Sequence, residues 1–89
     1  MAKKRERLEI IKDILSSVKE KKQIKPTRLL QASNLSPQMF KKYINELLDK
    51  NLLKKEDIKK KKYFLLTSKG FEFLEEYKTI VNFIENFGI

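Results

Sequence analysis

Four polar side chains between Pro37 and Lys50 have the spacing and the chemistry of a surface that contacts nucleic-acid bases. Gln38, Lys41, Lys42 and Asn45 fall on one side of a helix of about 3.6 residues per turn. The amides of Gln and Asn pair in bidentate fashion with adenine, and Lys donates to guanine or to phosphate. No Arg lies on this side of the helix. We therefore expect contact with double-stranded DNA and only weak discrimination between bases.

Further cations and one hydroxyl extend this candidate surface. Arg28 is expected on the outer side of a short helix, where it would contact a phosphate. Ser36 and the N–H groups of the helix start behind it are expected to hold another phosphate. A lysine run suits contact with the DNA backbone or the minor groove. The run consists of Lys59, Lys60, Lys61 and Lys62, and a basic arm is expected from Lys3, Lys4, Arg5 and Arg7.

The charge distribution supports a polyanionic partner. The 89 residues carry a net charge of +9. Residues 1–70 hold 20 basic and 8 acidic residues, which gives +12, whereas residues 71–89 hold one basic and four acidic residues, which gives −3. The positive field therefore belongs to the body of the chain and not to its last helix.

Missing residue types exclude several kinds of chemistry. The sequence contains no Cys and no His, so disulfides, thiolate metal sites and the commonest general base are absent. We expect no enzyme activity, no metal, no cofactor and no small-molecule ligand. The N-terminal segment lacks the continuous apolar region of a signal peptide, and no segment has the apolar length of a membrane span. The expected location is the cytoplasm, in association with the nucleoid.

Apolar spacing and turn chemistry predict the elements that position these residues. A first amphipathic helix is expected from Lys4 to about Lys22, with a buried face. That face contains Leu8, Ile11, Leu15 and Val18, flanked by Ile10 and Ile14. A short helix from Pro26 to Ser33 would bury Leu29, Leu30 and Ala32. Ser33 and Asn34 would form the next turn, and Leu35 would enter the core.

The helix that carries the candidate DNA face has the clearest boundaries. Ser36 is a preferred N-cap and Pro37 a preferred first helical residue, and Asn51 is a plausible stop. Its inward stripe comprises Phe40, Tyr43, Ile44, Leu47 and Leu48. Two short strands are expected over 52–56 and 62–66, joined by a lysine-rich turn over 57–61 whose type is not indicated because Gly and Pro are absent.

The last helix is expected to begin after Thr67 as its cap and to run to about Phe87, before Gly88. Five apolar residues step by four and three positions along it, as in a coiled-coil seam. They are Phe73, Tyr77, Ile80, Ile84 and Phe87. Phe71, Leu74 and Val81 widen the apolar arc. We expect part of this arc to pack on the protein's own core and the rest to bury against a second copy.

The order of elements is that of a winged helix, an α+β and mostly helical fold. The segments NLSPQMFKKYINELLDKNLL and LTSKGFEFL resemble the corresponding regions of prokaryotic winged helix-turn-helix regulators. More narrowly, the chain resembles the archaeal winged-helix chromosomal proteins of the "ten-a" family. This resemblance implies a DNA-binding homodimer joined by a coiled coil of the last helices. The chain departs from the pattern in its short, Phe-rich last helix and in Asn51, where such regulators have Gly.

We therefore expect a winged-helix DNA-binding part over residues 1–70 and a dimerisation helix over 71–89, in one structural unit. The hypotheses that remain open are an architectural chromatin protein, which the lysine-only ribbon favours slightly, and a transcriptional regulator. The alternative is a winged-helix adaptor that binds protein and not DNA. A lysine run also occurs as a merely solvated face, but its position on a ribbon after a helix-turn-helix favours DNA contact.

Overall fold

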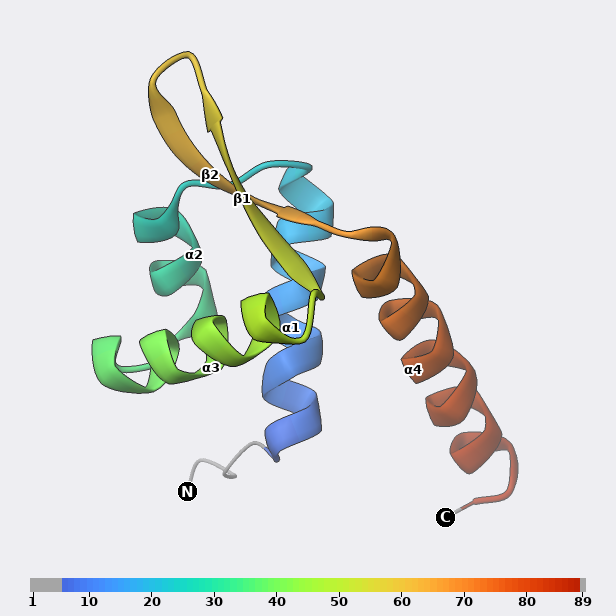
Figure 1. Cartoon of the computed structure of the whole chain (residues 1–89). Coiled ribbons are helices and arrows are strands. Elements are labelled where there is room, and N and C mark those ends of the chain that lie inside the picture. Colours follow the sequence, from blue (N-terminus) through green and yellow to red (C-terminus); the bar gives the residue numbers. More distant parts are fainter. Residues whose placement is uncertain (1–5, 89) are drawn as a thin grey trace.

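A computed structural model describes residues 6–88 and shows four helices and one two-stranded antiparallel sheet in these residues. The helices are α1 (Arg7–Lys21), α2 (Pro26–Ser33), α3 (Pro37–Asp49) and α4 (Ser68–Asn86), and the strands are β1 (Leu53–Ile58) and β2 (Lys61–Leu66). Helix α1 lies in the middle, with α2 and α3 to one side and α4 to the other (Figure 1). The strands form a narrow ribbon, hereafter the wing, that projects from one end of the molecule (Figure 1). The expected winged-helix fold is confirmed.

Helix α1 forms the centre of the core because its apolar residues recur every three or four positions. Ile14, Leu15 and Val18 are almost fully buried, and Ile10 and Ile11 are buried beside them. The expectation for Leu8 was wrong, since this side chain is 56% exposed. Leu8 lies in the first turn of the helix, beyond the reach of the core. The start expected at Lys4, like the basic-arm residues Lys3, Lys4 and Arg5, lies outside the described residues.

Helix α2 and the turn after it follow the prediction closely. Leu29 is fully buried, and Ser33 is buried with its hydroxyl donating to the carbonyl of Leu30 at 2.7 Å. Asn34 takes the left-handed conformation, with φ 57°, and Leu35 packs against the core. Ala32 is exposed, so its predicted burial was wrong.

Helix α3 is defined at both ends by local hydrogen bonds. Ser36 caps its start by accepting from the N–H of Met39 at 3.3 Å. At its end, Asn51 has φ 60°, and the N–H groups of Asn51 and Leu52 donate to the carbonyls of Leu48 and Leu47. This pair of hydrogen bonds is a Schellman motif, in which Asn takes the place usually held by Gly. The predicted stop at Asn51 is confirmed.

The wing is longer and its turn tighter than the sequence indicated. Ile58 pairs directly with Lys61, so only Lys59 and Lys60 connect the strands. Both have positive φ, 51° and 67°, which is the pattern of a type I′ turn. The turn expected over 57–61 was therefore too long, because strand pairing extends through Asp57 and Ile58. A further bridge between Ile24 and Phe64 ties the wing to the α1–α2 connection.

Helix α4 begins in contact with the end of α3. The hydroxyl of Thr67 accepts from the N–H of Gly70 at 3.0 Å, which confirms the predicted cap. A Cβ at position 70 would collide with the carbonyl oxygen of Leu52 and lie 3.1 Å from Leu66 Cδ2. Glycine at this position is therefore required by close packing. The helix then runs away from the body, with Leu74 as its last buried residue (Figure 1).

Candidate nucleic-acid interface

The outer face of α3 presents the polar residues that the sequence indicated. Gln38, Lys41, Lys42 and Asn45 are all exposed, while the opposite face of the helix is buried in the core. Met39 is also exposed, in the first turn beside Gln38, and was not among the residues predicted for this face. Its position three residues before Lys42 places it on the same face of the helix, and this spacing could have identified it from the sequence. Its thioether side chain provides apolar contact of the kind that thymine methyl groups accept.

Ser36 has a structural role that the sequence only partly indicated. Its hydroxyl oxygen already accepts from Met39, so it satisfies one N–H of the helix start. The hydroxyl proton remains a donor, because capping uses only the oxygen lone pairs. Phosphate contact at Ser36 therefore stays a prediction that the cap does not contradict.

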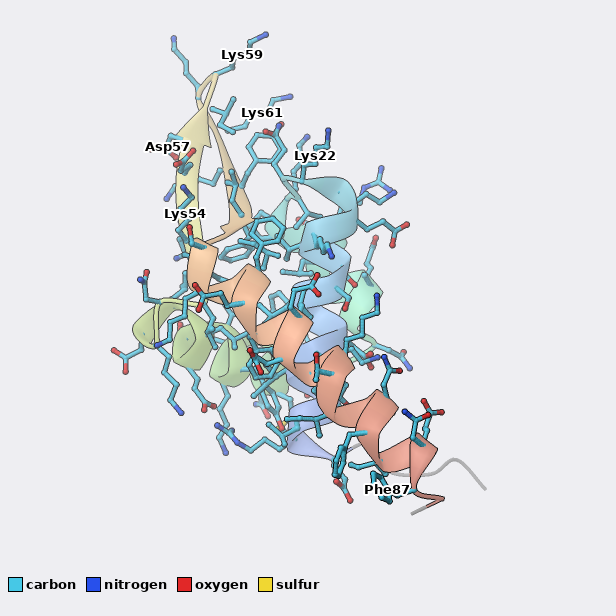
Figure 2. The ribbon with its side chains drawn as sticks, turned by 90° about the vertical axis from the view of Figure 1, so that its right-hand side faces the viewer. Lys22, Lys54, Asp57, Lys59, Lys61 and Phe87 are labelled. Carbon is cyan, nitrogen blue, oxygen red and sulfur yellow. The ribbon has the colours of Figure 1, made fainter. Side chains whose placement is uncertain are left out.

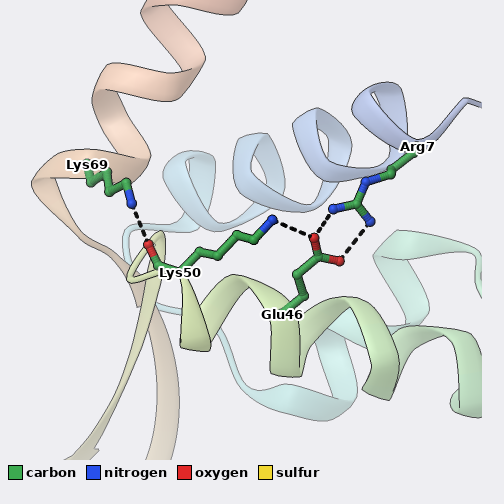
Figure 3. Close-up of polar contacts among 4 residues, drawn as sticks. All are labelled: Arg7, Glu46, Lys50 and Lys69. Atoms are coloured by element: carbon green, nitrogen blue, oxygen red, sulfur yellow. Dashed lines mark hydrogen bonds and ion pairs between the residues drawn. The ribbon is translucent and has the colours of Figure 1, made fainter.

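Glu46, on the flank of α3, is held by two cations (Figure 3). Arg7 Nη1 donates to Glu46 Oε1 at 2.7 Å, and Arg7 Nη2 pairs with Oε2. Lys50 Nζ lies 3.1 Å from the same Oε2. Arg7 was expected in a free basic arm, and that expectation was wrong because Arg7 sits in α1 and is engaged by α3. The pairing neutralises a carboxylate that would otherwise repel an anion near the outer face.

The wing places its four lysines differently from one another. Lys59 and Lys60 form the turn, whereas Lys61 and Lys62 lie in β2, where neighbouring side chains point to opposite faces. Lys62 stands across from Asp57 in the register, which offsets part of its charge. Figure 2 shows Lys59 and Lys61 at one end of the molecule and Phe87 at the other. The lysines at the tip of the wing are therefore far from the exposed end of α4.

Arg28 is exposed in the first turn of α2, as predicted. It lines a surface cavity of about 310 Å³ that the sequence did not indicate. Lys21, Gln23, Ile24, Lys25 and Tyr63 form the rest of the lining. The residues come from the end of α1, the α1–α2 connection, α2 and β2, so only the tertiary structure brings them together.

Acidic residues are missing from the entire segment between Glu20 and Glu46. The 25 residues 21–45 contain no Asp or Glu and six cations. The six are Lys21, Lys22, Lys25, Arg28, Lys41 and Lys42. This segment comprises the end of α1, all of α2 and the outer face of α3. In a protein that is 37% charged, this segment contributes only positive charge, which favours contact with a polyanion.

Packing on the protein's own core covers only the first part of the expected dimer seam. Phe73 packs against the core and stacks on Tyr77, with ring centroids 6.2 Å apart. Lys12 Nζ lies 6.0 Å from the Tyr77 ring centroid, and a hydrogen bond to Asp13 raises the pKa of Lys12 above its usual value. In contrast, Ile80, Ile84 and Phe87 are exposed. Only the second half of the seam is therefore uncovered in one chain.

Phe83 belongs to the uncovered half of α4, although it was not among the residues predicted for the seam. It is 59% exposed, and its ring centroid lies 4.8 Å from that of Phe87. The spacing of Ile80, Phe83 and Phe87 by three and four positions could have identified it from the sequence.

Within residues 6–88, no helix is long and apolar enough to cross a membrane, and no acidic cluster that could hold a metal ion is present.

Comparison with known sequences identifies the class of protein that this architecture defines. The chain belongs to the winged helix-turn-helix family, whose model matches residues 4–85. The sequence is 36% identical over 81 residues to the uncharacterized protein MJ0290 of Methanocaldococcus jannaschii, covering 91% of this chain and 36% of that protein. It is 42% identical over 67 residues to the uncharacterized protein MJ0287 of the same organism, covering 75% of this chain and 64% of that protein. The chain thus spans less than two thirds of both relatives.

A solved structure of the same fold is that of Sso10a-2, a DNA-binding protein from Sulfolobus solfataricus. The TM-score is 0.76 at 22% sequence identity, and the alignment covers 93% of this chain and 85% of Sso10a-2. At this identity the likeness establishes the shared fold. Together with the archaeal relatives, it confirms the winged-helix resemblance expected from the sequence.

Proposed function

We propose that this chain is a DNA-binding protein without enzyme activity, which binds double-stranded DNA broadly as a homodimer. The observation that carries the proposal is the segment 21–45, which contains no acidic residue. It includes α2 and the exposed face of α3, which we call the recognition helix. A helix with its polar face exposed and its N-terminus free fits the major groove. DNA binding by Sso10a-2, which has the same fold, supports the proposal. The corresponding location is the cytoplasm, on the nucleoid.

In this proposal the lysines supply affinity and a few residues supply weak base preference. Lys41 and Lys42 on α3 and Lys59 to Lys62 on the wing neutralise phosphates and release counterions. Gln38 and Asn45 are the groups on α3 that pair with a base edge in bidentate fashion. The absence of Arg from this face favours an architectural role over operator recognition, since Arg to guanine is the commonest specific contact.

The proposed dimer forms through the uncovered half of α4, which continues the predicted seam of Phe73 and Tyr77. Ile80, Phe83, Ile84 and Phe87 are 38–68% exposed, so burial of each would contribute a part of the ~1.5–3 kcal/mol that complete burial of such a side chain gives. Their spacing lets two copies of the same helix pack against each other. In this arrangement residues 1–70 bind DNA and residues 71–89 dimerise. Leu74 of the second part packs in the core of the first, as expected for a single structural unit.

Titration of random-sequence duplexes at two salt concentrations tests the proposal. With about six to ten phosphates neutralised per dimer, log K falls steeply with log salt, and unrelated DNA competes well. The variant Lys59→Gln with Lys60→Gln should lower the slope, by about one for each phosphate that is no longer neutralised. The control, Lys19→Gln with Lys78→Gln, has the same charge change at exposed sites outside the wing and should retain the slope.

Other results would point to the other candidate functions. A salt-independent or undetectable interaction with DNA would overturn the proposal and favour the protein-binding adaptor. A footprint on a pseudo-palindrome, with poor competition by unrelated DNA, would instead indicate a transcriptional regulator. Loss of DNA retention when Lys41, Lys42 and the wing lysines are replaced by Glu would argue against the adaptor.

A further inference from the structure

The cavity between α1, α2 and β2 is lined by positively charged side chains, none of which belongs to α3. Lys21, Lys25 and Arg28 line it together with Tyr63, and no acidic residue contributes to the lining. Its volume of about 310 Å³ lies at the lower end of the range of small-molecule sites, which is roughly 300–1,000 Å³. A small anionic group is therefore sterically and electrostatically suited to it.

The three cations of the cavity have no carboxylate partner within residues 6–88, unlike four other cations of these residues. Arg7 and Lys50 pair with Glu46, Lys12 pairs with Asp13, and Lys54 pairs with Glu56. Within residues 6–88, none of the three cavity cations forms an ion pair. Lys25 and Arg28 also stand at the start of α2, where the helix dipole is positive and cations are unfavourable. The lining of the cavity therefore carries three positive charges without a carboxylate partner, which a bound anion would offset.

The walls of the cavity are held by backbone hydrogen bonds. Ile24 N–H donates to the carbonyl of Phe64 at 3.1 Å, and Phe64 N–H donates to the carbonyl of Ile24 at 2.8 Å. These two bonds join the α1–α2 connection to the wing strand that carries Tyr63. The backbone that carries the cationic side chains is thereby positioned before any ligand arrives, which reduces the entropy lost on binding.

We propose that this cavity is a binding site for a phosphate group, held by Lys21, Lys25 and Arg28. Arg donates in a fork that matches two phosphate oxygens, and the Lys ammonium groups add charge-assisted hydrogen bonds. The phosphate belongs either to the DNA backbone beside the wing or to a small phosphorylated molecule. The first of these sources rests on the proposed DNA binding, whereas the site itself does not.

Inorganic phosphate is the probe that tests the site. We expect it to shift the amide resonances of residues 23–25, 27 and 28 saturably at constant ionic strength, maintained with chloride. The variant Lys21→Gln with Arg28→Gln should weaken this response roughly tenfold, because charge-assisted hydrogen bonds are removed. The control Lys19→Gln with Lys78→Gln should respond like the unaltered protein. Lys19 is a good match for Lys21, since both lie in the last turn of α1, about 200° apart around the helix at 100° per residue.

Equal responses in all three proteins, or a linear response without saturation, would indicate general ionic screening and overturn the proposal. Circular dichroism and thermal melting verify that the exposed substitutions leave the fold intact. Addition of a short duplex then separates the two sources. If DNA supplies the phosphate, saturation with duplex abolishes the phosphate response, and the cavity variant has a lower salt slope for DNA than the control. If a small molecule supplies it, the DNA-bound protein keeps its phosphate response. Were DNA binding itself to fail, the phosphate titration alone would still decide the site.

Discussion

Thr67 donates its hydroxyl to the carbonyl of Asn51 at 2.6 Å, and this bond joins the end of the recognition helix α3 to the start of the last helix α4. The same hydroxyl accepts from Gly70 N–H, and Lys69 Nζ donates to the carbonyl of Lys50 at 2.8 Å. The start of α4 is therefore anchored to the backbone that follows α3. In a dimer formed through α4, this junction sets the relative orientation of the two recognition helices.

Substitution of Gly70 by Ala should disturb this junction. The added Cβ meets the carbonyl of Leu52, which is backbone and cannot move aside as a side chain does. We expect the free energy of unfolding to fall by about 1–3 kcal/mol, the usual range for overpacking, as measured by urea denaturation. Ser68→Ala, at an exposed position in the same turn, is the control. An unchanged midpoint for Gly70→Ala would show that α4 is not closely packed on Leu52.

Replacement of Lys59-Lys60 by Asn-Gly should stabilise the fold and weaken DNA binding at once. A left-handed conformation costs an ordinary L-residue about 1–2 kcal/mol, whereas Asn and Gly adopt it readily. The melting temperature is therefore expected to rise, while the salt slope of DNA binding falls because two charges are removed. Lys59→Gln with Lys60→Gln removes the same charges without relieving the turn. If this variant melts as high as Asn-Gly, backbone strain is not the cause of the stabilisation.

Ile84→Lys should produce a monomer. The substitution places a charge within the exposed apolar half of α4, where burial against a second copy would require its desolvation. Sedimentation measures the change, and DNA binding should weaken because two linked half-sites become one. Asn82→Lys introduces the same charge on an exposed position of the same helix, about 200° from Ile84, and should remain dimeric. A dimer that persists in Ile84→Lys would place the interface elsewhere.

Removal of Arg7 should affect DNA binding more than stability. Arg7→Gln leaves Glu46 with Lys50 as its cation, and exposed ion pairs contribute only about 0–1 kcal/mol. With Lys50 as its one remaining cation, the Glu46 carboxylate on the flank of α3 should repel DNA more strongly and lower its affinity. The double variant with Glu46→Gln should restore affinity, which a double-mutant cycle of DNA titrations measures. Failure of the second substitution to restore binding would mean that Arg7 contacts DNA directly.

The order of the elements and the capped ends of the helices could be predicted from the sequence alone, whereas the bounds of the wing strands could not. Ser36 and Thr67 cap helix starts, and Asn34 and Asn51 end helices, through hydrogen bonds among residues only a few positions apart. Such interactions depend on residue type and spacing, so they can be predicted without knowledge of the fold. The exposed polar face of α3 followed from the same helical period.

Contacts between distant elements set which charges are paired, which residues line the cavity and which part of α4 is uncovered. Arg7 and Glu46 are 39 positions apart, and the cavity joins residues of α1, α2 and β2. The pairing register reduced the wing turn to Lys59 and Lys60, and packing on the body covered the first half of the α4 seam but not the second. These features arise from contacts between elements distant in the chain. Helical and strand periods identify the face that packs, but the docking of the elements selects its partner.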